Sequence, residues 1–207
     1  FSNIVDNDIV FDSYGFPYIP ARRIRGLLKE AANEYGQFDS SKVDLEEQLF
    51  GDETSHLFGL HNAKIEKLKE IHEEIDRMDK EDKKYVSPIS VLNHYTSIRH
   101  QTSIDDNGIA KENSLRSTRV VNRGVEFYAP VEYLEEDKKD LEDILAFVRH
   151  MGLRRTRGFG EVRLTLEAEK KENKNVFDVV SKLDDDREYE LKLQVVNRSQ
   201  LTITGSN

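Results

Sequence analysis

The 207-residue chain contains no cysteine and no tryptophan, and only four of its residues are proline. Without cysteine there is no disulfide, no zinc site built on thiolates and no cysteine nucleophile. The sequence also lacks the run of about 18 apolar residues that a membrane-spanning helix needs. The first residues, FSNIVDNDIVFD, have neither the basic start nor the apolar stretch of a signal peptide. We therefore expect a cytoplasmic protein with no membrane partner.

Positive charge is scarce overall, because the net charge is -9, yet it is gathered locally. A composition of 37% hydrophobic and 34% charged residues is ordinary for a folded globular protein. Because a uniformly negative surface repels phosphates, any binding of nucleic acid has to be local. Three basic segments stand out in the chain: residues 21–30, 114–124 and 149–163. The last of these holds five arginines against a single acid.

The spacing of apolar residues predicts the secondary structure. Proline at the first turn and glycine at the stop delimit the first expected helix, and Asn107-Gly108 is a strong hairpin signal. The expected elements are a helix from Pro20 to Gly36, a helix over 65–78, extended segments over 90–106 and 118–133, a helix from 141 to about Met151, and a strand over 162–168.

This order is that of a β-α-β-β-α-β module whose first strand is missing. The fold class that we predict is therefore α+β, ferredoxin-like, with a helical insertion at about 38–90. We expect the first strand to precede Phe1, so that the chain would be a fragment. We expect one domain over 1–170, a linker over 171–188 and, over 189–207, the first strand region of a second module.

Three motifs resemble the RAMP superfamily of CRISPR proteins, which are RNA-binding ferredoxin-like modules. They are DNDIVFDSYGFPYIPARRIRGLLKEAA, IRHQTSIDDNGIAKENSLRSTRVVNRGVEF and the glycine-rich GLRRTRGFGEV. The first two motifs, especially the stretch RHQTSIDDNGIA, most resemble the two-module subunit of type III-D systems. The resemblance implies a subunit of a type III antiviral interference complex that binds CRISPR guide RNA, with target RNA and other subunits as partners and no cofactor.

The candidate RNA-binding residues lie in the glycine-rich stretch and at the start of the first helix. Glycine permits close backbone approach to phosphates, arginine supplies bidentate charge, and a helix start favours anions. Phe159 either stacks on a base or anchors the loop in the core. The alternative for the arginines is solvation or pairing with nearby acids. The candidates are Gly152, Arg154, Arg155, Arg157, Gly158, Phe159 and Gly160, with Arg22, Arg23, Arg25 and Gly26.

Two aspartates are the candidate catalytic residues of the chain. In type III backbone subunits of the family, an aspartate ahead of the PYIP helix helps to cut target RNA, and the matching candidates here are Asp6 and Asp8. Capping and turn formation by the aspartates is the alternative. Because Ala21, Arg22 and Arg23 follow PYIP where cutting subunits carry glycine and serines, we expect a guide-binding subunit. An endoribonuclease is the first alternative, and an assembly scaffold that binds no RNA is the second.

No metal site is expected from the histidines. The six histidines are His56, His61, His72, His94, His100 and His150. None of them has the spacing of a zinc or iron site. A phosphate-binding P-loop is also excluded, because GFGEVRL lacks the lysine that has to follow.

Overall fold

The structure is a computed structural model, which describes residues 5–51, 58–81, 85–153, 159–166 and 188–191. In chain order its elements are α1 (Ala21–Phe38), η1 (Ser40–Lys42), α2 (Leu45–Phe50), β1 (Gly59–Leu60), α3 (Leu68–Glu81), α4 (Pro88–Tyr95), β2 (Thr96–Gln101), β3 (Arg116–Val121), β4 (Ala129–Glu132), η2 (Glu135–Asp137), α5 (Lys138–Phe147) and β5 (Glu188–Leu191). This mixture of helices and small sheets confirms the α+β class. No helix in the described part of the chain is long and apolar enough to cross a membrane.

Helix α1 begins after Pro20, as predicted, but it does not stop at Gly36. It continues to Phe38, and the Asp39 N–H closes the last turn on the Tyr35 carbonyl. Gly36 has a different use, because a Cβ at this position would lie 2.7 Å from the Lys42 carbonyl oxygen. The glycine therefore allows η1 to pack back against the end of the helix.

The segment before β2 is helical, so the expectation of an extended segment from residue 90 is wrong for 90–95. Pro88 occupies the first turn of α4, where a residue without an N–H costs nothing. Leu92 is the buried residue of this helix. The Thr96 hydroxyl donates to the Leu92 carbonyl at the point where the helix gives way to β2.

Two small sheets are present in the described residues. Strands β2 and β3 pair antiparallel, with Thr96 opposite Val121 and Gln101 opposite Arg116. Strands β1, β4 and β5 form the second sheet, in the order β1-β4-β5.

The lead-in, residues 5–16 ahead of the PYIP segment, lies with Asn7 at the free edge of β3, where we had not expected a strand. Asn7 forms a parallel bridge with Thr118. The Asn7 N–H donates to the Ser117 carbonyl at 3.2 Å, and the Arg119 N–H donates to the Asn7 carbonyl at 2.9 Å. We had placed the first strand of the module before Phe1. In the structure the lead-in itself pairs with β3, so the acidic motif lies beside this sheet.

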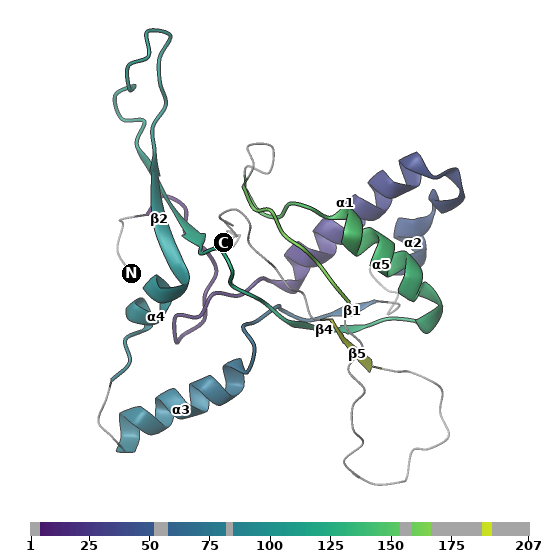
Figure 1. Ribbon diagram of the computed structural model, residues 1–207, viewed down its shortest axis with the longest axis horizontal. Coiled ribbons are helices and arrows are strands. Elements are labelled where there is room, and N and C mark those ends of the chain that lie inside the picture. The colour runs from purple at the N-terminus through teal and green to yellow at the C-terminus, as the bar shows by residue number, and fades with distance from the viewer. Residues whose placement is uncertain (1–4, 52–57, 82–84, 154–158, 167–187, 192–207) are drawn as a thin grey trace.

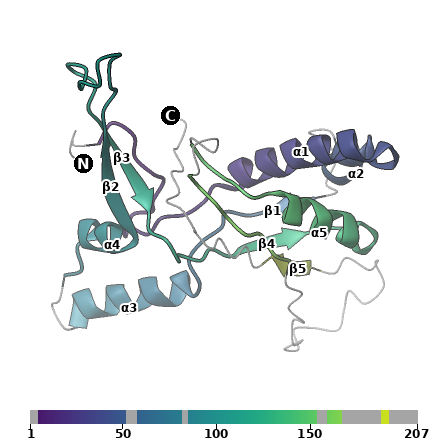
Figure 2. The same cartoon turned by 45° about the horizontal axis from the view of Figure 1, so that its top comes forward.

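The two sheets occupy different ends of the molecule. In Figure 1 the β2–β3 hairpin projects at one end, while α1, α2 and α5 gather at the other, around β1 and β4. Figure 2 shows the same separation, with α3 lying apart from α1 and α5. Fully buried side chains of α1, α2 and α5 form the centre of the core, with Phe127 ahead of β4: Ile24, Leu28, Leu45, Phe50, Phe127, Leu141, Ile144 and Leu145.

Tyr14 of the lead-in holds the insertion helix α3. Its ring stacks on His72 with centroids 4.0 Å apart. Its hydroxyl donates to Asp76 Oδ1 at 3.0 Å, and this hydrogen bond raises the pKa of Tyr14. The predicted helix at 65–78 therefore exists, and it is docked on the segment that precedes α1.

A half-buried ion pair joins η1 to α5. Lys42 Nζ lies 2.6 and 2.7 Å from the two carboxylate oxygens of Asp140, whose side chain is only 12% exposed. The hydrogen bond to Asp140 raises the pKa of Lys42. The pair fixes the insertion against the helix that leads into the glycine-rich stretch.

We expect Lys42→Met to lower the free energy of unfolding by about 1–2 kcal/mol, because it leaves the Asp140 carboxylate poorly solvated and without its cation. Urea unfolding at neutral pH measures the change. Lys69→Met, on the exposed side of α3, is the matched control and should change stability by less than about 0.5 kcal/mol. Equal stability of the two variants would show that the ion pair contributes nothing.

Candidate nucleic-acid interface

Residues 149–151 and 160–162, on either side of the glycine-rich stretch, pair as the antiparallel stem of a hairpin. The Met151 N–H donates to the Gly160 carbonyl, and the Val162 N–H donates to the Arg149 carbonyl, both at 2.8 Å. Helix α5 ends at Phe147. We had expected it to end near Met151, but residues 149–151 are extended and pair with 160–162.

Two glycines enclose the end of this hairpin. Gly152 has φ +89° and Gly160 has φ +69°, which is the left-handed region that other residues seldom adopt. A side chain at either position would strain the turn out of the stem. The two predicted glycines therefore have a conformational reason to be present. Four other candidates, Arg154, Arg155, Arg157 and Gly158, lie outside the described residues.

Phe159 places the hairpin against the β2–β3 sheet. The Arg99 guanidinium lies 5.2 Å from the centroid of the Phe159 ring, within the range of a cation–π contact. Phe159 and Leu153 also line a cavity of about 30 Å³ on the sheet. Of the two uses that we considered for Phe159, this packing favours an anchor for the loop.

Side chains of the sheet complete this cavity, and our sequence analysis did not single them out. They are Asn7, Arg99, Gln101, Thr118 and Val120. Arg99 lies opposite Thr118 in the register, so both belong to one face. The alternation of side chains along IRHQ and RSTRVV predicts which residues of each strand share a face. It does not predict which residues of the two strands lie opposite each other, because that depends on the register.

The arginines at the start of α1 have different environments. Arg22 and Arg23 are exposed. Arg25 points inward, where Nη1 donates to the Phe58 carbonyl at 2.9 Å and Nη2 donates to the Phe50 carbonyl at 2.8 Å. Arg25 thereby ties α1 to α2 and to the segment before β1.

The amino end of α1 is partly occupied by a side chain. The Ala21 N–H donates to Asn62 Oδ1 at 2.8 Å, and the Arg23 N–H donates to the Pro20 carbonyl. Gly26, one turn further on, is exposed, and a Cβ there would meet no atom within 4 Å. Packing within the chain therefore does not explain the glycine, which leaves close approach of another molecule as a reason for it.

The acidic candidates of the lead-in make internal contacts. Asp6 Oδ2 accepts from the Ser117 N–H at 2.6 Å. Asp8 Oδ1 accepts from Arg119 Nε at 3.0 Å and from the Ile9 N–H at 2.9 Å. The Arg119 side chain, which is only 11% exposed, belongs to the second basic segment, so part of that segment is neutralised inside the protein.

Asp12 behaves as the turn-forming alternative predicts. Its Oδ1 accepts from the N–H groups of Tyr14 and Phe16, each at 2.9 Å. Gly15 within this turn has φ +91°. Asp12 therefore closes the turn ahead of the PYIP segment.

Alternation separates the acids from the cavity. Side chains of an extended segment point to opposite sides in turn. Asn7 lines the cavity with Phe159, while the Asp8 side chain meets Arg119, which also donates to Asn93 and Thr96 on the α4 side. The cavity side of the lead-in is therefore the uncharged one. The described residues also contain no group of three or more His, Asp or Glu that could hold a metal ion.

Arg25→Lys should lower the melting temperature by several degrees, because a lysine ammonium cannot donate to both carbonyls in this fork geometry. Differential scanning fluorimetry of the purified chain measures the shift. Arg22→Lys, which retains an exposed charge on the same turn, is the control and should leave the melting temperature nearly unchanged. Equal shifts for both variants would contradict the structural use of Arg25.

Comparison with known proteins agrees with this fold. A profile described as the RAMP superfamily matches residues 1–163, and no curated protein matches the chain. A chain in the cryo-EM structure of the Type III-B Cmr-beta bound to cognate target RNA is 13% identical, with a TM-score of 0.54, covering 78% of this chain and 89% of that one. A chain in the apo state of Type III-B Cmr-beta is 16% identical, with a TM-score of 0.56, covering 77% and 87%.

Proposed function

Because the chain belongs to the RAMP superfamily, we propose that it binds CRISPR guide RNA as a subunit of a type III antiviral interference complex. The observation that carries the proposal is the glycine-rich hairpin on the β2–β3 sheet, held by Phe159 and Arg99. In this proposal, the glycine-rich stretch and its three arginines supply amides and guanidinium groups that bind phosphates.

The fold match supports the same assignment. Type III-B Cmr-beta, one of whose chains shares this fold, has a structure bound to cognate target RNA. On that basis target RNA and the other subunits of a type III complex are the partners that we propose. The type III-D subtype rests on the similarity of the first two motifs, above all of the stretch RHQTSIDDNGIA.

The proposed RNA path uses two parts of the site. Arg154, Arg155 and Arg157 bind the guide backbone at the end of the hairpin, and Arg22, Arg23 and Gly26 extend the path over the start of α1.

Holding RNA, and not cutting it, is the activity that we propose. The carboxylates of Asp6 and Asp8 accept hydrogen bonds from β3. A general base has to reach the proton that it removes. Because both carboxylates are already used in these hydrogen bonds, the proposal gives neither of them a part in cleavage.

Replacing Arg154, Arg155 and Arg157 together with alanine should weaken binding of a guide-length single-stranded RNA at least tenfold. The slope of log affinity against log salt should become shallower by about 2, since each phosphate contact with a single strand contributes about 0.7. Fluorescence anisotropy over a salt series measures both quantities. Replacing Lys69, Arg77 and Lys80 of α3 with alanine removes the same charge elsewhere. If the two triple variants behaved alike, the proposal would be overturned.

Gly26→Gln should separate stability from binding. Glutamine is a better helix former, so the free energy of unfolding should rise by about 0.5–1 kcal/mol. The same side chain should weaken RNA binding severalfold, because it would occupy the space that the guide backbone approaches. Ala146→Gln adds similar bulk to an exposed position of α5 and should leave the RNA affinity unchanged. A Gly26→Gln variant that binds RNA as the parent does would remove α1 from the path.

A further inference from the structure

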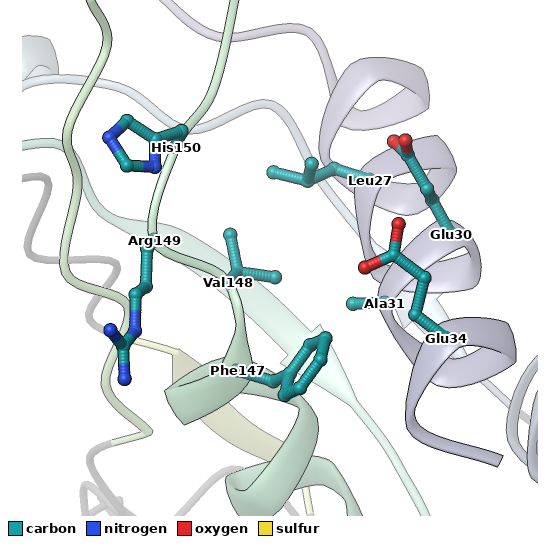
Figure 3. Close-up of a pocket in the computed structure, with 8 residues that line it drawn as sticks. All are labelled: Leu27, Glu30, Ala31, Glu34, Phe147, Val148, Arg149 and His150. Atoms are coloured by element: carbon teal, nitrogen blue, oxygen red, sulfur yellow. The ribbon is translucent and has the colours of Figure 1, made fainter. Parts of the chain in front are cut away.

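A groove separates α1 from the end of α5, beside the stem of the hairpin. Its volume is about 420 Å³, and it is open to solvent. Four residues of α1 and four consecutive residues, from the last residue of α5 onward, line it: Leu27, Glu30, Ala31 and Glu34, with Phe147, Val148, Arg149 and His150. Figure 3 shows the two walls facing each other.

The inside of this groove is apolar and its α1 edge is acidic. In Figure 3 the side chains of Leu27 and Val148 and the ring of Phe147 point into the groove, and the carboxylate of Glu34 lies at its α1 side. Glu30 stands one turn away on the same edge. Arg149 and His150 also line the groove, and in Figure 3 their side chains point away from α1.

Exposed aromatic surface continues the groove at one end. Phe38 is 81% exposed and Phe147 is 36% exposed. Their ring centroids lie 6.2 Å apart, and the Tyr35 ring lies 6.1 Å from that of Phe147. A contiguous exposed patch of aromatic side chains is typical of a protein interaction site, whereas a single exposed residue would need no explanation.

The charge of the groove indicates what kind of molecule it binds. Two carboxylates on the edge repel a phosphate backbone, so RNA is disfavoured here. The Glu34 carboxylate favours a lysine or an arginine beside an apolar side chain that fills the groove. We propose that this groove binds a basic, apolar segment of a second protein. The inference does not rest on RNA binding, because neither Glu34 nor Phe38 belongs to the proposed RNA path.

The test places a photoreactive benzophenone amino acid at position 38 of the full chain, within the assembly isolated from cells that contain its partners. After irradiation, mass spectrometry identifies the segment joined to position 38. We expect a segment of a second protein that carries lysine or arginine next to leucine, isoleucine or an aromatic residue. Adducts with RNA, with another copy of this chain or with the chain itself would each overturn the proposal, as would no adduct.

Charge reversal then tests the acidic edge. Glu30→Lys together with Glu34→Lys should reduce the adduct at least roughly tenfold, because like charges then meet across the interface. A synthetic peptide of the cross-linked segment should lose affinity for the full chain by a similar factor. Reversing the basic residues of the peptide should restore binding to the doubly reversed chain. An adduct that survives the charge reversal would overturn the choice of a basic partner.

Two controls keep the result interpretable. Glu73→Lys, on the exposed side of α3, makes the same change of charge per residue and should leave the adduct intact. If the double reversal impairs folding, Glu34→Gln serves as the milder variant. We expect it to reduce the adduct by an intermediate amount. Guide RNA is quantified in the same samples. Absence of the protein adduct with guide RNA still bound would contradict this inference alone, whereas absence of guide RNA would contradict the proposed function.

Discussion

Two main-chain hydrogen bonds, from Met151 to Gly160 and from Val162 to Arg149, hold the glycine-rich segment as a hairpin. They end α5 at Phe147, so the chain turns out of the helix before the basic residues begin. The positive φ of Gly152 and Gly160 makes this turn accessible. With the stem fixed, Phe159 reaches the sheet and meets Arg99. The position of the proposed phosphate-binding loop relative to the β2–β3 sheet therefore depends on this stem.

Strand alternation explains how a protein of net charge -9 can keep acids away from the surface that we propose for RNA. At β3 the two aspartates of the lead-in accept hydrogen bonds from the Ser117 N–H and the Arg119 side chain. The uncharged Asn7 lines the cavity beside Phe159. At α1, Arg25 donates hydrogen bonds to two main-chain carbonyl groups, and Arg22 and Arg23 are exposed. Glu30 and Glu34, further along the same helix, line a separate groove. On α1, charges of opposite sign are therefore separated by their position along the helix.

Periodicity alone predicted much of this fold. It placed α1 after Pro20, the insertion helix α3, the β2–β3 pair around Asn107-Gly108 and the approximate position of α5. It failed at 90–95, where Pro88 and a buried Leu92 favour a short helix over the extended segment that we expected. It also missed the pairing of Asn7 with β3, because a single parallel bridge leaves no alternating pattern in sequence. The glycines of the hairpin were predictable from their type. The inward turn of Arg25 and the contact of Arg99 with Phe159 were not, since both depend on tertiary packing.

Cross-linking of the assembled complex with a guide RNA that carries 4-thiouridine tests the central claim most directly. The account predicts adducts on the hairpin between Gly152 and Gly160, on the neighbouring β2 residues Arg99 and Gln101, and on the exposed start of α1. It predicts none on α3 or in the groove between α1 and α5. Adducts confined to α3 or to that groove, with the hairpin unmodified, would contradict it.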